Sequence, residues 1–455
     1  MNTFVKFQGS DNNTTPLSPP DPRFLHDRIQ RYYTERVENA WAGGHPMKGR
    51  SPRPGDVQMR TNDYLGLAGH PKVIAAEVSA LRAGGHGDAV SRVWLHKERD
   101  SIAAFEGRLA RVLRAEDAVL VNSGYCANVG LIQAITEPDA PVFVDMKAHI
   151  SLWEGISSAK AVPRPFRHNS AAHLERQILK HGPGVVAVDA LYSTDGAVAP
   201  LADIVDVVER HGCVLVVDET HSFGAHGKNG GGLCVALGLE ERVHFRTIGL
   251  SKAVASRGGA IACSKRNAEY FRYESLPVIF STSVLQHEVA GYDAVLDILA
   301  NETWRQAQLH RNHHYLRGHL DALGYNVDVS AHQIIALEAG PQLETMRLRD
   351  ALESRGVFGA IFFPPATPEK RCLIRFTLNC GHTRAELDHV ISVCRDVRDE
   401  LDVPGWASSR RRKGIAAASG VISDAKMQGT SRLRAGSDER PADAGHDQEG
   451  SQEAA

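Results

Sequence analysis

Two charged residues directly follow strand-like apolar runs, and both could do chemistry there. Asp218 ends the run CVLVV, where an ionised carboxylate is costly to bury unless a cation or a protonated ring nitrogen pairs with it. Lys252 follows the next such run, within RTIGLSKAVASRGG. The serines and glycines around it offer hydroxyls and open backbone N–H groups suited to phosphate. A lysine partly removed from water can also form a Schiff base with an aldehyde.

Two further segments could complete a site. NSGYCAN (122–128) is typical of a strand, a glycine turn and a helix start, whose free N–H groups favour phosphate. It matches neither G-x-G-x-x-G nor G-x-x-x-x-G-K-[ST], so a nucleotide fold gains little support. DMKAHISLWEG (145–155) places His149 shortly after a strand. Taken singly, each feature has a simpler reading: a solvated strand-end acid, a surface lysine, a packed histidine.

The elements that must position these residues follow an α/β pattern. Apolar runs of strand length alternate with helix-period stretches such as 201–212; the runs are 117–124, 140–146, 184–190, 213–219, 244–250 and 259–264. This alternation predicts a mostly parallel sheet buried on both faces. Ligands of such sheets bind beyond the carboxyl ends of the strands. Polar residues follow several runs there: Asn122-Ser123-Gly124, Asp145, Asp189 and Asp218-Glu219.

The sequence pattern changes after about residue 290. Residues 302–324 are typical of one long helix, and 334–340, 357–364 and 371–378 of strands in a smaller α+β domain. The expected organisation is an N-terminal arm with first helices (1–60), a cofactor-binding large domain (61–295), a small domain (296–404) and a disordered tail (405–455).

Bulk composition excludes several classes of protein. The chain has 455 residues, of which 42% are apolar and 23% charged, as is typical of globular proteins. Its net charge of -2 gives no indication of nucleic-acid binding. No apolar run approaches roughly 18 residues, so no integral membrane association is expected. The N-terminus lacks the apolar core of a secretory signal. Seven scattered cysteines without a C-x-x-C pair argue against zinc or disulfides and favour a cytoplasmic location.

Together these features indicate one site. A phosphate turn, an imidazole that could stack on a ring, a buried acid and an aldehyde-accepting lysine are predicted at one end of one sheet. The set suits pyridoxal 5′-phosphate (PLP), which supplies an electron sink while the protein orients it. Asp218 would keep the pyridine nitrogen protonated, so that the ring can accept carbanion charge.

Residues 60–400 resemble the fold-type-I PLP enzymes, specifically the α-oxoamine synthases (5-aminolevulinate synthase, 8-amino-7-oxononanoate synthase, serine palmitoyltransferase). The resemblance rests on eight segments in order: TNDYLGLAGHP (61–71), NSGYCAN (122–128), DMKAHISLWEG (145–155), LYSTDGAVAPL (191–201), VDETHSFGAHG (217–227), LSKAVASRGG (250–259), FSTS (280–283) and LIRFTLNCGHT (373–383). It implies an α/β PLP-dependent transferase with a large, mostly parallel-sheet domain and a smaller C-terminal α+β domain.

Within that family, three stretches are most similar to the α-hydroxyketone quorum-sensing autoinducer synthases: 123–133, 243–259 and 271–291. This resemblance implies decarboxylative condensation of a medium-to-long-chain fatty acyl-CoA with a small amino acid, 2-aminobutyrate or S-adenosylmethionine. The α-aminoketone product would be the precursor of an α-hydroxyketone signal. A homodimer with active sites at the interface is implied too.

Matching motifs carry the family's roles onto this chain. The resemblance implies catalytic roles for Lys252, His149, Asp218 and His221. It implies cofactor contacts for Gly124, Tyr125, His149, Ser193, Asp218, His221, Ser251, Lys252, Ser281 and Thr282, the last two reaching the neighbouring subunit's phosphate. Arg375 should bind the amino-acid carboxylate, because a guanidinium pairs with it bidentately, and Asn62 and Tyr64 should also lie at the substrate. No metal is expected.

Two departures from the family pattern stand out. Most members have Thr three residues before the lysine, helping to hold the phosphate, whereas this chain has Gly249. Ser251 or a hydroxyl from the other subunit would then substitute. The segment 84–100 also lacks the usual glycine run and carries Trp94, Leu95 and His96. Substrate choice is therefore expected to differ from that of the biosynthetic synthases.

Three alternatives remain open from the sequence. The first is a biosynthetic α-oxoamine synthase with another acyl donor. The second is a metal-dependent hydrolase built on Asp218, Glu219, His221 and His226, although no H-E-x-x-H spacing supports it. The third is a non-catalytic scaffold, like the partner subunit of serine palmitoyltransferase that lacks the lysine. The presence of Lys252 argues against the third.

Overall fold

The computed structural model describes residues 19–87, 90–95 and 101–416, with side chains described up to residue 411. The chain divides into two compact units, Met1–Ser409 and Arg410–Ala455. Both β-sheets belong to the first unit. The domain boundaries expected from the sequence within that unit stay a prediction.

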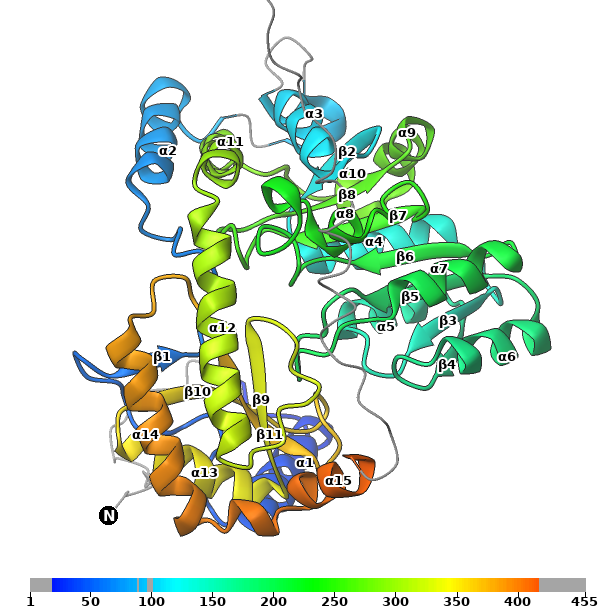
Figure 1. Cartoon of the computed structure of the whole chain (residues 1–455). Coiled ribbons are helices and arrows are strands. Elements are labelled where there is room, and N and C mark those ends of the chain that lie inside the picture. Colours follow the sequence, from blue (N-terminus) through cyan, green and yellow to red (C-terminus); the bar gives the residue numbers. More distant parts are fainter. Residues whose placement is uncertain (1–18, 88–89, 96–100, 417–455) are drawn as a thin grey trace, which may run out of the picture. The chain divides into compact units, whose positions relative to one another are not determined.

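The larger sheet has seven strands in the order β2-β8-β7-β6-β5-β3-β4 (Figure 1). Its strands are β2 (Asp117–Val121), β3 (Pro141–Asp145), β4 (Val162–Phe166), β5 (Val185–Asp189), β6 (Val214–Asp218), β7 (Phe245–Gly249) and β8 (Gly259–Cys263). β8 is antiparallel to both of its neighbours, and the other pairs are parallel. The predicted α/β class with a mostly parallel sheet is confirmed.

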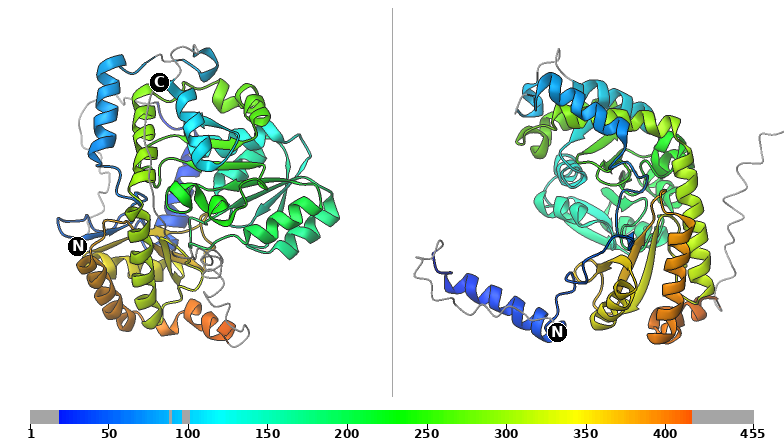
Figure 2. Two further views of the ribbon diagram at one scale, coloured as in Figure 1. Left: turned by 45° about the horizontal axis from the view of Figure 1, so that its top comes forward. Right: turned by 90° about the vertical axis from the view of Figure 1, so that its left-hand side faces the viewer.

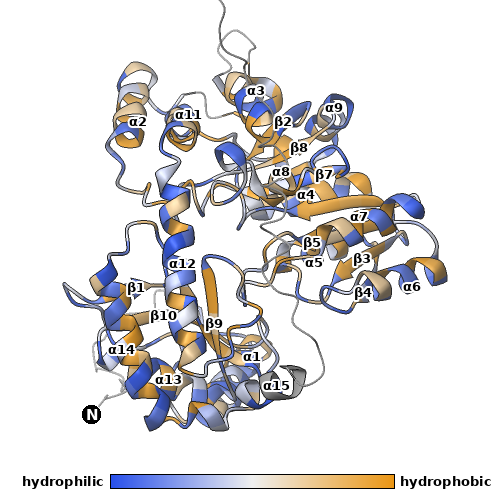
Figure 3. Cartoon of the chain, viewed as in Figure 1, coloured by the Kyte–Doolittle hydropathy of each residue, from blue (hydrophilic) through white to orange (hydrophobic). Residues whose placement is uncertain are grey.

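Helices cover both faces of this sheet because successive strand residues point to opposite sides. Val186 and Val188 of β5 pack with α6 (Ala171–His181) and α7 (Leu201–Arg210). Val185 and Ala187 pack on the other face with α4 (Gly124–Ile135) and α5 (Ile150–Ser158). Figure 3 shows the resulting hydrophobic colouring of the strands.

Strand β4 was not predicted from the sequence. Its residues read VPRPF, and prolines at positions 163 and 165 remove two ladder donors. Such a strand fits only at an edge, and β4 is the edge strand next to β3. The register is parallel, with Val142 opposite Pro163 and Val144 opposite Pro165.

The smaller sheet has the order β1-β10-β11-β9. Its strands are β1 (Val57–Met59), β9 (Ile334–Gly340), β10 (Val357–Phe362) and β11 (Cys372–Thr377). Beside it lie α12 (Trp304–Ala322), α13 (Gln342–Ser354) and α14 (Arg384–Glu400), as Figure 2 shows. The predicted long helix and three C-terminal strands are confirmed. β1 was not predicted, because a three-residue strand gives too short a pattern.

The described part of the chain contains further helices. They are α1 (Arg23–Arg31), η1 (Tyr32–Ala40), α2 (Pro71–Gly84), η2 (Arg92–Trp94), α3 (Ser101–Leu113), η4 (Lys228–Gly230), α8 (Gly232–Leu237), α9 (Lys265–Glu274), α10 (Leu276–Ile279), α11 (Gln286–Asn301), η5 (Val403–Gly405) and α15 (Ala407–Ala416). Within the described ranges, no helix is long and apolar enough to cross a bilayer.

The expectation of disorder from residue 405 is wrong for residues 405–416. Gly405 is the last residue of η5, and α15 follows from Ala407. Ser408 is buried, its hydroxyl donates to the Glu338 carbonyl at 2.7 Å, and its own carbonyl accepts from Asn326 Nδ2 at 2.8 Å. These contacts hold a polar segment that has no apolar periodicity. The rest of the predicted tail, 417–455, and residues 1–18 of the predicted arm lie outside the described residues.

Candidate active site

The carboxyl ends of the central strands bring polar side chains together. Asp189, Asp218 and Thr247 are direct register partners on β5, β6 and β7. All three are buried. This edge is where a parallel sheet binds its ligands.

Asp218 is held in a fixed orientation by two hydrogen bonds. Asn128 Nδ2 donates to Oδ2 at 2.7 Å, and the Thr220 backbone N–H donates to Oδ1 at 2.8 Å. Asn128 is itself fixed, because the Thr247 hydroxyl donates to its Oδ1 at 2.6 Å. The carboxylate can therefore pair with a cationic ligand atom without being reoriented.

His149 caps the start of α5 next to this acid. Its backbone N–H donates to Asp189 Oδ1 at 3.1 Å, and its Nδ1 lies 2.7 Å from the Ser151 hydroxyl. Burial lowers the pKa of His149, the Asp218 charge opposes that shift, and the Lys252 charge adds to it. A neutral imidazole results, which can face an aromatic ring. Burial, and then the Asp218 charge, hold the pKa of Asp189 well above its usual range.

Lys252 lies in the turn that joins β7 to β8. Two backbone hydrogen bonds close this turn, from Leu250 N to the Gly258 carbonyl at 3.0 Å and from Ser256 N to the Leu250 carbonyl at 3.1 Å. Burial, and then the Arg375 charge, lower the pKa of Lys252, while the Asp218 charge opposes the shift. A lowered amine pKa is what a nucleophilic or proton-accepting lysine requires.

Tyr64 and His221 form a buried pair. The Tyr64 hydroxyl lies 2.6 Å from His221 Nδ1, and Gln333 Nε2 donates to the His221 carbonyl at 2.7 Å. Burial, and then the Lys252 charge, hold the pKa of His221 well below its usual range. Burial also raises the pKa of Tyr64, so both groups are neutral near pH 7.

Arg375 of β11 has its guanidinium inside the protein, without a carboxylate partner among the described residues. It donates to the Ser193 carbonyl at 2.6 Å and to Asn62 Oδ1 at 3.2 Å, and it lies 4.7 Å from the centroid of the Phe362 ring. Its Nε is buried with no hydrogen bond, and among the described residues no carboxylate lies within ion-pair distance. Burial lowers its pKa. A buried, incompletely bonded guanidinium is suited to a ligand carboxylate.

Three glycines bring backbones into contact beside this cluster. A Cβ on Gly124, the first residue of α4, would lie 2.9 Å from Gly249 Cα. A Cβ on Gly259 would lie 2.4 Å from the Gly124 nitrogen. Any side chain would push the start of α4 away from β7 and β8. The helix start, which favours a phosphate, is thus held close to the Lys252 turn.

Four of the predicted contact residues lie at the rim. Tyr125 is exposed and meets the His149 ring edge-on, with centroids 6.5 Å apart. Ser251 is exposed in the lysine turn. Asn122 Nδ2 donates to the Ser281 hydroxyl at 2.9 Å and to the Thr282 carbonyl at 2.7 Å. Ser281 and Thr282 therefore contact Asn122 of their own chain, two residues before Gly124. That they reach the phosphate of a second subunit stays a prediction.

Two of the four residues proposed for a metal hydrolase, Glu219 and His226, have other partners. Glu219 Oε1 accepts from the Cys234 N–H at 2.9 Å, and Oε2 lies 3.8 Å from Arg246. His226 Nε2 lies 2.9 Å from Gln333 Oε1. In the described part of the chain, no three His, Cys, Asp or Glu side chains are grouped as metal ligands. This hypothesis gains no support.

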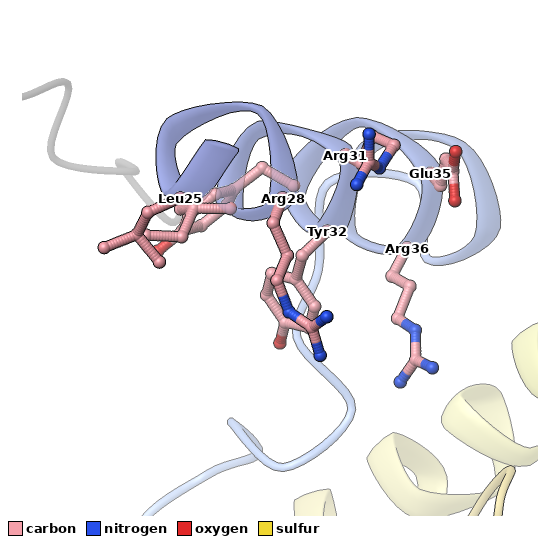
Figure 4. Close-up of a pocket in the computed structure, with 8 residues that line it drawn as sticks. Leu25, Arg28, Arg31, Tyr32, Glu35 and Arg36 are labelled. Carbon is pink, nitrogen blue, oxygen red and sulfur yellow. The ribbon is translucent and has the colours of Figure 1, made fainter. Parts of the chain in front are cut away.

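A hollow on the N-terminal helices has no part in this cluster. It is lined by residues of α1 and η1 alone: Leu25, Arg28, Ile29, Arg31, Tyr32, Tyr33, Glu35 and Arg36. Figure 4 shows Arg28, Tyr32 and Arg36 projecting from one side of the helix. Basic and apolar groups mix there, without a nucleophile or acid–base pair.

Sequence reasoning missed the residues that support the site. Asn128 and Thr220 lie within quoted motifs, yet no role was given to either. One signal was available for Asn128: it is a polar residue in an apolar helical stretch, GYCANVGLIQ. Gln333 gave no such signal, because only the tertiary fold brings it to His221. Ser151 lies two residues from His149, but its link to Asn128 depends on the packing of α5 against α4.

Comparisons with known proteins agree with this geometry. Residues 54–393 match the model of the aminotransferase class I and II family. The chain belongs to that family, and within it to the α-oxoamine synthases, PLP-dependent acyltransferases that act on acyl-CoA and amino-acid substrates.

Three individual relatives illustrate the relationship. The CAI-1 autoinducer synthase of Vibrio campbellii is 39% identical over 381 residues, covering 84% of this chain and 96% of the relative. The 8-amino-7-oxononanoate synthase 1 of Bacillus subtilis is 30% identical, covering 76% and 89%. A structure of serine palmitoyltransferase from S. paucimobilis, with a bound PLP–myriocin aldimine, has a TM-score of 0.74 at 27% identity, covering 84% and 98%.

Proposed function

We propose that this enzyme condenses a medium-to-long-chain fatty acyl-CoA with 2-aminobutyrate or S-adenosylmethionine. The α-aminoketone formed would be the precursor of an α-hydroxyketone signal. The observation that carries the proposal is the buried Arg375 guanidinium, which has no carboxylate partner among the described residues and affects the pKa of Lys252. Similarity to the CAI-1 autoinducer synthase over 96% of its length supports the signal branch.

The residues present fit PLP. Asp218 would pair with the ring nitrogen, since its oxygens are fixed by Asn128 and Thr220. Gly124 and the start of α4 would hold the phosphate, and the neutral His149 would face the ring. When bound, PLP supplies the electron sink for a carbanion.

The chain's own groups would then move the protons. Lys252, with its lowered pKa, would accept the proton from the amino acid's α-carbon and return one after CO₂ leaves. Arg375 would hold the amino-acid carboxylate until that step. His221 has a depressed pKa and its Nδ1 lies against the Tyr64 hydroxyl. Accepting from Tyr64 at Nδ1 would leave the His221 proton on Nε2, available to the cofactor or substrate.

The function also requires a second copy of the chain if Ser281 and Thr282 are to reach a phosphate. We infer a homodimer with active sites at its interface. Support comes from α1, which has no buried residue and exposes Phe24 and Ile29. Exposed apolar side chains on a helix without buried residues are suited to a partner surface.

Release of free coenzyme A by the PLP-loaded protein tests the function. Short, medium and long acyl-CoAs are crossed with glycine, alanine, serine, 2-aminobutyrate and S-adenosylmethionine, with Lys252→Ala as the inactive control. Release restricted to medium-to-long chains with 2-aminobutyrate or S-adenosylmethionine is the expected result. No release with any pair, at full PLP occupancy, would contradict it.

A biosynthetic α-oxoamine synthase is the second candidate. The 30% identity to the 8-amino-7-oxononanoate synthase 1 of Bacillus subtilis favours it over unrelated activities. Release from pimeloyl-CoA with alanine, succinyl-CoA with glycine, or palmitoyl-CoA with serine would support this candidate and overturn the signal-synthase proposal.

A further inference from the structure

We propose that Thr220 supplies the phosphate-binding hydroxyl that position 249 lacks in this chain. The inference rests on the proposed placement of PLP between Asp218 and the start of α4. Ser251, the substitute expected from the sequence, is exposed in the turn beyond β7. Thr220 comes instead from the segment after β6, two residues beyond Asp218.

The space that a side chain at position 249 would need is filled by Thr220. A Cβ on Gly249 would lie 2.8 Å from Thr220 Cγ2 and 3.2 Å from Thr220 Oγ1. The first distance is shorter than real Cβ contacts allow, so a side chain at 249 and the present Thr220 exclude one another. The Thr220 side chain, with its methyl carbon nearest and its hydroxyl next to it, thus occupies the volume that a side chain at residue 249 would need.

The same hydroxyl lies at the start of α4. A Cβ on Gly124 would be 3.5 Å from Thr220 Oγ1. This end of the twelve-residue helix carries partial positive charge and favours a phosphate oxygen. The hydroxyl could donate to an oxygen held by that helix end, because it is half-buried and has no hydrogen bond within the described residues.

Thr220 is also tied to the other end of the cofactor site. Its backbone N–H donates to Asp218 Oδ1 at 2.8 Å. One residue would therefore fix the distance between the acid that faces the ring nitrogen and the hydroxyl that faces the phosphate. Thr220 acts as a positioning residue for the cofactor rather than as a proton carrier.

Cofactor affinity tests the inference without any assay of turnover. Thr220→Val keeps the shape and removes the hydroxyl, whereas Thr220→Ser keeps the hydroxyl. Equilibrium dialysis gives the Kd of each protein for PLP and for pyridoxal, which lacks the phosphate. The Val variant should bind PLP roughly 10- to 100-fold more weakly, since hydrogen bonds to charged groups are the strong ones, and should bind pyridoxal like the wild type. The Ser variant should stay within a few-fold of wild type for both.

A position swap provides the sharper control. Gly249→Thr alone should weaken PLP binding, because the new side chain collides with Thr220. Thr220→Ala with Gly249→Thr should bind PLP more tightly than either single variant. If the double variant binds PLP no more tightly than the two single variants, the inference that either position can supply the hydroxyl is overturned.

The outcomes separate this inference from the proposed function. If the wild type does not bind PLP, the proposed function fails. If the wild type binds PLP and Thr220→Val binds it equally well, only the role of Thr220 is overturned. Equal weakening for PLP and pyridoxal also overturns it, because the lost contact would then not involve the phosphate.

Discussion

Asn128 and Asp218, 90 residues apart in the chain, are joined by a hydrogen bond of 2.7 Å between amide Nδ2 and carboxylate Oδ2. The same amide donates to the Ser151 hydroxyl at 2.8 Å, and that hydroxyl lies 2.7 Å from His149 Nδ1. One buried amide therefore orients both the acid and the imidazole of the candidate site. Neither side chain can turn without losing its own hydrogen bond to this network.

Replacing this amide tests how far it supports the site. Asn128→Ala removes the acceptor of the buried Thr247 hydroxyl and one of the two donors to Asp218, so the free energy of unfolding should fall by about 1–3 kcal/mol. Coenzyme A release should fall as well, because Asp218 and His149 lose their fixed orientation. Chemical denaturation and the release assay measure the two effects. Asn301→Ala, at the exposed end of α11, is the control and should change stability by less than about 0.5 kcal/mol. If Asn128→Ala changed neither the free energy of unfolding nor coenzyme A release, the supporting role of the network would be contradicted.

Lys252→Ala should stop turnover and leave the fold intact. Loss of the only proposed proton carrier at the α-carbon should lower coenzyme A release by about 10²–10⁴-fold or more. Circular dichroism should match the wild type, because Lys252 makes no ion pair in the described structure that stabilises the turn. Lys265→Ala, in an exposed helix start, should release coenzyme A at the normal rate. Near-normal turnover by Lys252→Ala would contradict the mechanism.

Arg375→Lys should change the KM for the amino acid but not the KM for acyl-CoA. Lysine keeps the charge but cannot pair bidentately with a carboxylate or keep both bonds, to Ser193 and Asn62. The KM for the amino acid should rise by about 10- to 100-fold, which corresponds to the loss of one charge-assisted hydrogen bond. The KM for acyl-CoA should change little. The surface variant Arg384→Lys should alter neither, and an equal rise in both KM values would show that Arg375 does not select the amino acid.

A cluster of histidines predicts how stability depends on pH. The His226 ring lies 5.0 Å from that of His310 and 4.1 Å from that of His332. Burial lowers the pKa of His332 and of nearby His313 to about 3, whereas an unfolded histidine titrates near about 6.5. As the pH falls below about 6.5, the unfolded chain takes up these protons first, so the free energy of unfolding decreases toward pH 3.

The slope gives the test. Each such histidine contributes up to about 1.4 kcal/mol per pH unit. Urea denaturation between pH 7.5 and 4.5 should show the decline, and His332→Gln should reduce its steepness. A slope that His332→Gln leaves unchanged would mean that this ring does not stay neutral in the folded protein.

The exposed apolar residues of α1 predict the oligomeric state. Phe24→Glu with Ile29→Glu should shift the protein from dimer to monomer in sedimentation velocity, because two buried carboxylates would be desolvated at the interface. Leu179→Glu is a matched control on α6, since Leu179 is 69% exposed, and it should leave the dimer intact. A wild-type monomer would contradict the homodimer.

The sequence predicted the elements whose signal is strong and local. Buried strands such as β5 and β6 are continuous apolar runs, and α7 has clear helical periodicity. β4 was missed because its prolines contradict a strand pattern, and the start of α15 because Ser408 and Ser409 are buried by contacts with distant segments.

The candidate site divides in the same way. Asp218, Lys252 and His149 stand at strand ends, so a chain pattern could find them. The contact of Thr220 with Gly249 and that of Asn128 with Asp218 join different strands and helices. Such contacts depend on the register between strands and on how closely a glycine lets two segments approach. The sequence of a single segment determines neither.

The edge strand β4 has a consequence for how the chain behaves at high concentration. The Val162 N–H donates inward to the Ala140 carbonyl at 2.9 Å. Strand alternation therefore points the nitrogens of Pro163 and Pro165 outward, where each lacks a hydrogen. A foreign strand arriving at this border of the sheet would find acceptors without the matching donors. This edge of the seven-stranded sheet is thereby protected against pairing with a neighbouring molecule while newly made chains are still crowded together.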